Sequence, residues 1–398
     1  MELLEDLKKR KLIYQFTPGI EEFFKKKGIL YFGIDPTAES LHLGHYLSIS
    51  FLKRFYLNGH KIIIVLGGGT SKIGDPSGKI KERPILPLKV LNKNKKNLKK
   101  QIKKFFPLNE KKIKLIDNSQ WLDNLKLAEF LREIGKIVSI NSMLDLEAVR
   151  QRLEHYEFMS FSEFTYQLLQ AYDFFILFKK YNCELQVGGS DQWGNIVQGV
   201  ELIRKKLGKK AYGLVYPLLV DPKTGKKFGK TEEGETLWLD YKKTHPFRIY
   251  QFLFNLDDET AKDLLLKFSF KPLRQLEKII EEGNKKIEER IIQKSLAQEL
   301  ILNIYGKKIL DEIIKINKIL FEKNFEKISL EEIKKLKHAI FTIKLKDKLS
   351  LEEVLVKLNL AKSKSEARNL MSNVKILEKG KFLLIKKGKK DFGLVEYK

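Results

Sequence analysis

Apolar residues in the first half of the chain form short continuous runs separated by stretches with helical periodicity. Gly28–Ile34 is a short apolar run that predicts a strand. Lys61–Leu66 is almost wholly Ile and Val, which is typical of a buried strand of a parallel sheet. From about Ser40 an apolar residue recurs at every fourth position, which predicts a helix with Ser40 as its N-cap. The recurring residues are Leu43, Leu47, Phe51 and Phe55.

The same patterns predict the remaining elements of this half. Strands are expected at Lys114–Ile116, Cys183–Val187 and Leu214–Val220. Helices are expected over 86–115, 121–160 and Phe161–Lys179, and from the glycines after Val187 to Lys206. Strands that alternate with helices up to about residue 220 favour an α/β fold with a doubly wound, Rossmann-like parallel sheet.

Beyond Pro246 the periodicity is helical, with expected helices at Phe247–Asn255, Asp258–Lys267, Leu273–Glu281 and Lys286–Tyr305. Residues 306–345 are expected to be partly helical and partly a linker, and a strand is expected at Phe382–Lys386. We therefore divide the chain into a nucleotide-binding domain at 1–220 with an insertion near 118–160, a loop and linker at 221–246, an all-α domain at 247–320 and a small α+β domain at 346–398.

Length and composition limit the class of protein. At 398 residues with 43% apolar residues, the chain can fill the cores of two or three domains. It has no run of 18 uncharged apolar residues, and its first ten residues lack the apolar core of a signal peptide, so we expect a cytoplasmic protein. Its single cysteine, Cys183, excludes an intrachain disulfide and a multi-cysteine zinc site, and we interpret it as a small buried apolar residue.

The chain is strongly basic, with 77 Lys and Arg against 51 Asp and Glu and a formal net charge of +26. Such a charge attracts a polyanion, most plausibly RNA or DNA, with a strong dependence on salt. Lysine is, however, spread over nearly every segment together with abundant Ile and Asn. A compositional bias of the kind found in AT-rich genomes could supply much of this charge without any binding role.

The turn after the first strand is the first candidate site. A strand followed by a tight turn and a helix directs backbone N–H groups and the positive end of a helix dipole at the space above the turn, which favours a phosphate. His42 and His45 are three residues apart and share one face, while Gly44 between them costs a helix roughly 1 kcal/mol relative to alanine. A glycine there indicates that something packs flat against the backbone. The alternative is two histidines that lie near a helix start by chance.

Two other patterns carry polar side chains. Tyr166, Gln170 and Asp173 lie at i, i+4 and i+7 on a mostly apolar helix, a stripe that suits a pocket wall, although it could also be an exposed stripe. Lys227 and Lys230 lie in a glycine-containing loop, which in isolation is typical of a solvated loop.

Five motifs, in order along the chain, resemble those of bacterial tyrosyl-tRNA synthetases, which are class I aminoacyl-tRNA synthetases. They are Tyr31–His45 with its His-Leu-Gly-His sequence, Ile73–Lys79, Gly188–Asn195, Lys226–Thr231 with its Lys-Phe-Gly-Lys-Thr sequence, and the S4-like pair Ser350–Leu355 and Ala361–Met371. The resemblance covers essentially the whole chain. In the S4-like unit, Ser372–Lys375 departs from the usual pattern, which has glycines before the first strand. The S4 fold is therefore better supported than intact RNA contacts.

The resemblance implies a reaction and its partners. L-tyrosine would be attached to tRNA(Tyr) in two steps, through tyrosyl-adenylate, with release of pyrophosphate and AMP. ATP with Mg²⁺, an anticodon-binding role for 247–320, an S4-like RNA-binding unit, a symmetric homodimer and no membrane partner are implied as well. Because the amino-acid carboxylate is itself the nucleophile, the protein would only need to position the reactants and stabilise the charge that moves onto pyrophosphate.

The resemblance also implies roles for individual residues. Catalysis would involve His42, His45, Thr37, Lys227, Lys230 and Thr231. Tyrosine would be held by Tyr31 and Asp173 at the phenolic hydroxyl, by Asp75, Tyr166 and Gln170 at the ammonium, and by Gln192 near the carboxylate. ATP would be held by Gly33, Asp35, Gly44, Gly189, Asp191 and Lys230, with Asp191 at the ribose and no resident metal.

Three alternatives stay open at this point. A tryptophanyl-tRNA synthetase has the same architecture, but Tyr31 with Asp173 favours a phenol over an indole. A non-catalytic RNA-binding relative would have no need of His42, His45 and the two lysines. A small-metabolite adenylyltransferase would have no use for residues 247–398.

Overall fold

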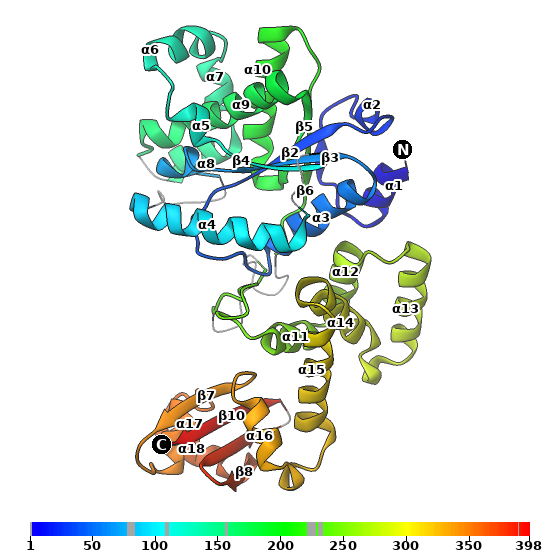
Figure 1. The fold of residues 1–398 in the computed structure, drawn as a ribbon, viewed down its shortest axis with the longest axis vertical. Coiled ribbons are helices and arrows are strands. Elements are labelled where there is room, and N and C mark those ends of the chain that lie inside the picture. The colour runs from blue at the N-terminus through cyan, green and yellow to red at the C-terminus, as the bar shows by residue number, and fades with distance from the viewer. Residues whose placement is uncertain are drawn as a thin grey trace. The chain divides into compact units, whose positions relative to one another are not determined.

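The computed structural model describes residues 2–77, 84–107, 111–155, 158–220, 228–229, 234–388 and 390–398 (Figure 1). The chain folds into two compact units. The first contains Met1–Thr236 and Asp263–Lys278, and the second contains Leu237–Lys262 and Ile279–Lys398. No helix within the described ranges is long and apolar enough to cross a membrane.

A six-stranded sheet organises the first unit. Its strands are β1 (Gln15–Phe16), β2 (Ile29–Ile34), β3 (Lys61–Leu66), β4 (Ile113–Asp117), β5 (Cys183–Gly189) and β6 (Tyr212–Tyr216), in the order β1-β6-β5-β2-β3-β4. All neighbours are parallel except β1, which pairs antiparallel with β6 at one edge. The chain winds outward from β2 in both directions, which confirms the predicted doubly wound parallel sheet. Sheets of this kind bind ligands at the carboxyl ends of their strands, next to this reversal.

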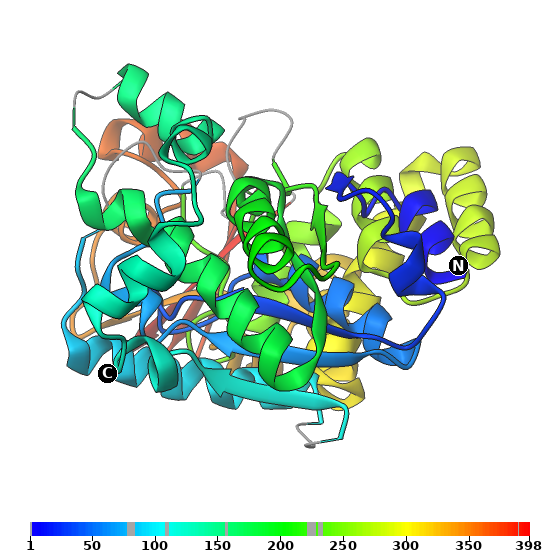
Figure 2. The same ribbon diagram turned by 90° about the horizontal axis from the view of Figure 1, so that it is seen from above.

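Helices cover both faces of this sheet. On one face lie α3 (His45–Leu57) and α4 (Leu88–Phe105), and on the other lie α9 (Phe161–Tyr181) and α10 (Trp193–Leu207) (Figure 1 and Figure 2). Two short helices, α1 (Glu2–Lys9) and α2 (Glu21–Phe24), precede β2 in the chain. After its first residue, every residue of β3 is buried, as expected for an Ile- and Val-rich strand covered on both sides.

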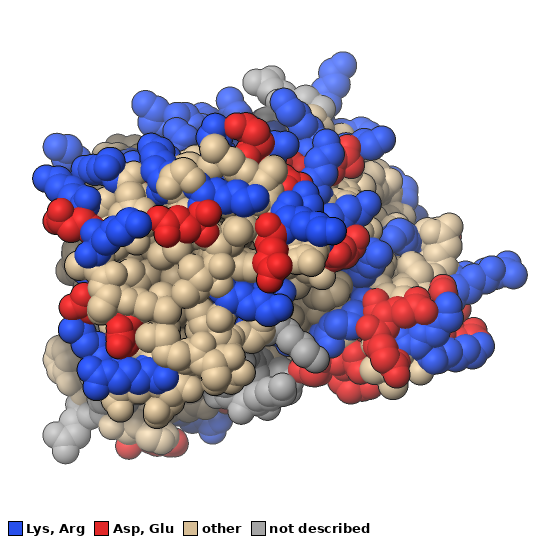
Figure 3. Space-filling model, turned by 90° about the horizontal axis from the view of Figure 1, so that it is seen from below, with Lys and Arg blue, Asp and Glu red and all other residues tan. Residues whose placement is uncertain are grey.

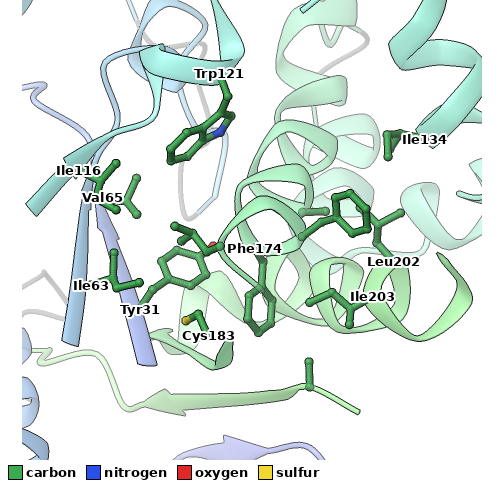
Figure 4. Close-up of a cluster of buried hydrophobic side chains, with 14 residues drawn as sticks. Tyr31, Ile63, Val65, Ile116, Trp121, Ile134, Phe174, Cys183, Leu202 and Ile203 are labelled. Carbon is green, nitrogen blue, oxygen red and sulfur yellow. The ribbon is translucent and has the colours of Figure 1, made fainter. Parts of the chain in front are cut away.

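A cluster of buried apolar side chains joins the sheet to α9 and α10 (Figure 4). In this cluster Tyr31 of β2 packs on Phe174 of α9, with 5.4 Å between their ring centroids. Cys183 of β5 is buried in the same cluster as a free thiol, which confirms its interpretation as a small apolar residue. The cluster fixes α9 against β2, so the polar side chains that α9 carries beside Tyr31 are held in defined positions.

The insertion between the two halves of the sheet consists of short helices: α5 (Ser119–Leu122), α6 (Leu127–Phe130), α7 (Ile140–Leu144) and α8 (Glu147–His155). Arg152 of α8 and Glu163 of α9 form an ion pair of 2.9 Å, with only 4% and 1% of their side chains exposed. Removing either partner would leave a buried charge uncompensated, so this pair fixes α8 on α9.

Several predicted boundaries are wrong. The helix expected at Lys286–Tyr305 begins at Ile291, because Arg290 before it is left-handed with a φ of 50°. The helix expected from Ser40 begins at His45, because the Ser40 hydroxyl is engaged by Gln101 of α4 and by the Leu41 carbonyl instead of capping a helix. The helix expected over 86–115 ends at Phe105, since the backbone is already extended at Phe106. The strand expected at Leu214–Val220 is β6, which lies earlier, at Tyr212–Tyr216.

Two buried arginines anchor Asp263–Lys278 to the first unit. Arg10 donates hydrogen bonds of 2.7 to 3.1 Å to the carbonyls of Leu266, Ser269 and Lys271. Arg54 donates to the carbonyls of Lys267 and Ser269, the first at 3.1 Å. Asp6 accepts from Arg10 at 2.8 Å and lies 3.8 Å from Arg54, so it balances both charges. These arginines satisfy carbonyls at the end of a helix that would otherwise lack partners.

The second unit is helical and then β-rich. Its helices include α11 (Pro246–Phe254), α14 (Ile291–Tyr305), α15 (Lys307–Asn317), α16 (Leu330–Leu336), α17 (Leu351–Lys357) and α18 (Lys364–Leu370), while α12 (Asp258–Phe268) and α13 (Leu273–Lys285) each belong partly to it. A four-stranded sheet follows, with β7 (Phe341–Leu345), β8 (Val374–Lys379), β9 (Phe382–Lys387) and β10 (Asp391–Tyr397) in the order β7-β10-β9-β8. The strand expected at Phe382–Lys386 is β9.

Two leucines of α3 test how much of the stability of the first unit comes from this packing. Leu52 is 2% exposed and Leu57 is 60% exposed. We expect Leu52→Ala to lower the free energy of unfolding by about 2–5 kcal/mol, because it leaves a cavity under the sheet, and Leu57→Ala to change it by about 0.5 kcal/mol or less. Urea unfolding of both variants measures the difference. Equal losses would contradict the assignment of this face of α3 to the core.

Candidate active site

A cavity of about 390 Å³ opens at the carboxyl ends of β2, β3, β5 and β6. Its lining includes every described residue to which the sequence gave a site role: Tyr31, Gly33, Asp35, Thr37, His42, Gly44, His45, Asp75, Tyr166, Gln170, Asp173, Gly189, Asp191 and Gln192. Lys227, Lys230 and Thr231 lie outside the described residues. The fold thus brings the predicted residues together, while their individual roles stay predictions.

Asp35, directly after β2, organises one wall of the cavity. Its Oδ2 accepts a hydrogen bond of 2.9 Å from the Tyr166 hydroxyl, and its Oδ1 accepts one of 2.8 Å from Thr70 Oγ1. Burial, followed by the nearby carboxylates of Asp35 and Asp75, raises the pKa of Tyr166 well above its usual value, so its hydroxyl stays a donor. A Cβ at Gly67 would collide with the Asp35 carboxylate, which explains the glycine at that position.

A chain of amides links α9 to α10 across the cavity. Asn195 donates to Gln170 Oε1 at 3.1 Å, Gln170 donates to Gln192 Oε1 at 3.2 Å, and Gln192 donates to Asp75 Oδ2 at 2.7 Å. The other oxygen of Asp75 accepts the Ser77 backbone N–H at 2.9 Å. Each amide is oriented by the next, so this wall presents Asp75 and Gln170 to the cavity in fixed positions.

The inner end of the cavity holds a buried carboxylate. Asp173 is 4% exposed, and it accepts hydrogen bonds from Trp121 Nε1 at 2.6 Å and from Asn118 Nδ2 at 2.9 Å. Burial raises the pKa of Asp173 to about 7, against the effect of these two donors, which favour the ionised form. The Gly69 backbone N–H donates to Asn118 Oδ1 at 2.8 Å, which directs the Asn118 NH₂ group toward Asp173.

Tyr31 provides a second polar group at this inner end. Its ring is part of the buried core, but its hydroxyl has no hydrogen-bond partner among the described residues. Burial, and then the charge of Asp173, raises the pKa of Tyr31 well above its usual value. A buried hydroxyl without a partner costs roughly 1–3 kcal/mol. A ligand hydroxyl placed between Tyr31 and Asp173 would remove that cost.

The two histidines lie close together at the start of α3. Their ring centroids are 3.8 Å apart, and His45 Nδ1 accepts the His42 backbone N–H at 3.1 Å. Since Nδ1 is an acceptor, a neutral His45 carries its proton on Nε2, which can donate to a ligand.

The sequence analysis predicted that both histidine rings lie on one face of a helix. In the structure only His45 belongs to α3, and His42 lies in the turn that leads into it.

Gly44 is where the two signature motifs meet. A Cβ at Gly44 would lie 2.9 Å from the Phe228 carbonyl oxygen, and one at Gly229, which has a φ of +103°, would lie 2.9 Å from the Gly44 nitrogen. The flat packing that the sequence predicted at Gly44 is therefore packing by the chain itself. It brings the middle of the Lys-Phe-Gly-Lys-Thr motif against the His-Leu-Gly-His motif.

The outer part of the cavity leaves room beside the backbone. A Cβ at Gly33 would meet nothing closer than the Tyr31 ring at 4.0 Å, so this position faces open space in the cavity. Within the described residues, no group of three or more His, Cys, Asp or Glu side chains could hold a metal ion. The open space beside Gly33 suits a planar group that lies against the backbone.

Several residues of the site were missed by the sequence analysis. Asn118 and Trp121 hold Asp173, Thr70 holds Asp35, and Asn195 begins the amide chain. Asn118 directly follows β4, so the carboxyl end of a predicted strand was an available signal for it. Trp121 gave no local signal, because its role depends on Asp173, which lies 52 residues further along the chain.

Comparison with known proteins gives consistent matches. The family model for class I tRNA synthetases (W and Y) matches residues 25–322. The tyrosine–tRNA ligase of Staphylococcus saprophyticus is 40% identical over 420 aligned residues, covering 100% of this chain and 99% of that protein. The tyrosine–tRNA ligase of Roseiflexus castenholzii is 40% identical, covering 92% of this chain and 88% of that protein. A crystal structure of a C-terminally truncated mitochondrial tyrosyl-tRNA synthetase of Aspergillus nidulans is similar with a TM-score of 0.72 and 33% identity, over 80% of this chain and 94% of that one.

Asp173 should make stability depend on pH in a defined direction. Its carboxyl has an ordinary pKa of 3.8 when unfolded and about 7 in the fold, so between these values the folded state holds more protons. Its contribution to stability is complete below pH 3.8 and is lost as the pH rises through 7, with a limiting slope of about 1.4 kcal/mol per pH unit.

Urea unfolding between about pH 4 and pH 7 measures this effect. We expect the free energy of unfolding of the wild type, relative to that of Asp173→Asn, to fall across this range. Asp123→Asn, at an exposed carboxylate, is the control and should run parallel to the wild type. A constant difference between the wild type and Asp173→Asn would contradict the raised pKa.

Proposed function

The chain belongs to the class I tRNA synthetases for tryptophan and tyrosine, and we propose that the described cavity is where it activates tyrosine. The enzyme attaches L-tyrosine to tRNA(Tyr) in two steps, using ATP. The tyrosine carboxylate attacks the α-phosphorus of ATP, which forms tyrosyl-adenylate and releases pyrophosphate. A terminal ribose hydroxyl of the tRNA then attacks the tyrosyl carbonyl, and AMP leaves.

One observation carries the assignment of tyrosine to this cavity. The Tyr31 hydroxyl and the Asp173 carboxylate are both buried at its inner end, and the hydroxyl has no partner among the described residues. A phenol satisfies both groups, because its O–H can donate to Asp173 while its oxygen accepts from Tyr31. A plain phenyl ring would leave the Tyr31 hydroxyl buried and unpaired, which disfavours phenylalanine. An indole N–H could donate to Asp173 but offers no acceptor to Tyr31, which disfavours tryptophan.

We assign the amino-acid backbone of the substrate to the amide wall. Asp75, Tyr166 and Gln170 offer a carboxylate, a phenolic oxygen and an amide oxygen near one another, which suits an ammonium group. Gln192, which bridges Gln170 and Asp75, lies where it can contact the substrate carboxylate. The residues of this wall are already oriented before the substrate enters.

ATP is assigned to the outer part of the cavity. His42, His45 and Thr37 would contact its phosphates, with His45 donating from Nε2, while Gly33, Gly44, Gly189, Asp35 and Asp191 would border the adenosine, with Asp191 at the ribose. Lys227, Lys230 and Thr231 would stabilise the charge that develops on pyrophosphate. Mg²⁺ would be held chiefly by the phosphates of ATP, because Mg²⁺ keeps several of its waters and is usually bound through substrate phosphates.

The tRNA would be bound largely outside this cavity. We assign anticodon binding to the helical region 247–320 and further RNA contacts to the S4-like unit 346–398, where α17 and α18 pack with the four-stranded sheet. Basic side chains, interleaved with acidic ones, are spread over the face of the molecule shown in Figure 3. The net charge of +26 favours the approach of a polyanion in general, without marking one patch.

We propose that the enzyme is a homodimer that shares tRNA between its subunits. Large exposed apolar side chains concentrate in the insertion and at the start of α9: Leu127, Leu131, Ile140, Leu144, Leu153, Phe158 and Phe161. Phe161 is 75% exposed and Phe158 is 69% exposed. Apolar patches of this kind are typical of protein interfaces, and a second copy of the chain is the partner that the family resemblance implies.

Pyrophosphate exchange with each of the twenty amino acids tests the substrate. We expect exchange with tyrosine and little with phenylalanine or tryptophan. Asp173→Ala should lower the ratio of kcat/KM for tyrosine over phenylalanine by ~100-fold, because the carboxylate that accepts from the substrate hydroxyl is removed. Asp123→Ala, at an exposed ion pair with Lys72, is the control and should keep the ratio. An unchanged ratio for Asp173→Ala would overturn the assignment of the phenol pocket.

Sedimentation velocity tests the dimer. We expect the wild type to sediment with twice the 46.6 kDa mass of one chain. Phe161→Asp should shift it toward the monomer, since a charge would be placed in the apolar interface, while an acidic residue at the first position of α9 suits the helix dipole. Tyr14→Asp, at a side chain that is 64% exposed elsewhere, is the control. A Phe161→Asp variant that stays dimeric would show that this surface is not the interface.

A further inference from the structure

The segment between β2 and α3 carries four residues of the site but has little structure of its own. β2 ends at Ile34 and α3 begins at His45, and Asp35, Thr37, His42 and Gly44 lie between them. At its start the Thr37 N–H donates to the Asp35 carbonyl at 2.8 Å, and at its end the His45 N–H donates to the His42 carbonyl at 2.9 Å. The middle of the segment therefore depends on contacts with other parts of the chain to keep its conformation.

Helix α4 packs against this segment. Its buried face contains Leu91, Leu98 and Ile102, as expected for a helix on a sheet, and also two amides, Asn94 and Gln101, which are 1% and 8% exposed. The outer face carries lysines and no acidic residue. Burying two amides in an apolar stripe is costly unless they form hydrogen bonds, so their partners indicate why they are there.

Gln101 uses both ends of its amide on this segment. Its Oε1 accepts the Leu41 backbone N–H at 2.8 Å, and its Nε2 donates to Ser40 Oγ at 2.9 Å. The Ser40 hydroxyl in turn donates to the Leu41 carbonyl at 2.8 Å. The backbone of Leu41, directly before His42, is therefore held at its N–H by Gln101 and at its C=O by Ser40.

Asn94 holds the other end of the segment. Its Nδ2 donates to the Pro36 carbonyl at 3.0 Å, directly before Thr37. Its Oδ1 is buried without a partner among the described residues. Leucine at this position would extend the apolar face of α4 without that cost, so the hydrogen bond to Pro36 is the contribution specific to asparagine. Lys93, beside it, adds an exposed ion pair of 3.2 Å with Glu39.

We infer that Asn94 and Gln101 are positioning residues for tyrosine activation, which hold the 36–41 segment so that Thr37 and His42 face the ATP phosphates. The inference rests on the proposed function of the cavity. Neither amide lines the cavity, so both act through the backbone that they hold. Because misplacing a catalytic group by about 1 Å can cost ~100-fold in rate, loosening this segment should slow adenylate formation without weakening tyrosine binding at the inner end.

Gln101→Leu, Gln101→Glu and Asn94→Leu test the inference. Leucine removes the acceptor for the Leu41 N–H, whereas glutamate keeps an acceptor there and can also accept from Ser40. We expect Gln101→Leu to slow single-turnover formation of tyrosyl-adenylate by about 10- to 100-fold, with the tyrosine dissociation constant within about twofold of the wild type. Gln101→Glu should recover most of the rate, and Asn94→Leu should show a smaller loss.

Hydrogen exchange supplies a readout independent of activity. The Leu41 amide should exchange faster in Gln101→Leu than in the wild type or in Gln101→Glu, because its acceptor is lost. Asn97→Leu is the matched control, since Asn97 is a half-buried amide of α4 whose side chain makes no hydrogen bond to a described residue, and it should change neither the exchange nor the rate. Unchanged tyrosine affinity in each variant shows that the fold is intact.

The outcomes separate this inference from the proposed function. Gln101→Leu with the wild-type rate of adenylate formation would overturn the inference alone, whether or not Leu41 exchanges faster. An equal loss of rate in Gln101→Leu and Gln101→Glu would also overturn it, because the acceptor would then not be what matters. A wild type that forms no tyrosyl-adenylate would overturn the proposed function, and the inference with it.

Discussion

The site depends on how one carboxylate is buried. Asp173 lies at the inner end of the cavity, and the two contacts that the structure gives its oxygens are from neutral donors, Trp121 and Asn118. Their hydrogen bonds limit the cost of a buried charge but do not cancel it, since the pKa of Asp173 is still raised to about 7. A ligand that brings one more donor stabilises the ionised form further. A phenol hydroxyl that donates to Asp173 is a donor of this kind.

The direction of these hydrogen bonds determines which donor and acceptor groups a ligand must offer at the inner end of the cavity. Trp121 can only donate, and Asn118 is turned with its NH₂ group toward Asp173 by the Gly69 N–H. The ionised Asp173 is therefore an acceptor, and a ligand hydroxyl beside it must donate. The oxygen of that hydroxyl is then free to accept from Tyr31, which burial keeps protonated. A phenol meets both requirements with one atom.

The sequence predicted the parts of this site that depend on local pattern. β3 lies at Lys61–Leu66 as predicted, because an unbroken Ile and Val run has one favourable environment, and the described site residues all line one cavity. The predictions failed where a side chain distant in the sequence determines where an element begins or what a residue contacts. Serine is a residue type that often caps helices, but the Ser40 hydroxyl accepts a hydrogen bond from Gln101, and α3 begins at His45. Trp121 has a role only once the fold places it on Asp173.

The two ends of the cavity are built differently, and the reaction gives a reason. At the inner end, which we assign to the phenol of tyrosine, Tyr31 comes from β2 and Asp173 from the long helix α9. Both elements are fixed by the buried core around Tyr31 and Phe174. At the outer end, which we assign to the nucleotide, Asp35, Thr37 and His42 come from a segment without regular structure. Asn94 and Gln101 of α4 hold this segment, and Gly44 lies in close contact with Phe228. Selection of an amino acid requires a rigid pocket, whereas the phosphates change charge and partner as pyrophosphate leaves. The hydrogen bonds from Asn94 and Gln101 keep the outer segment in position through that change, while the buried core fixes the inner end independently.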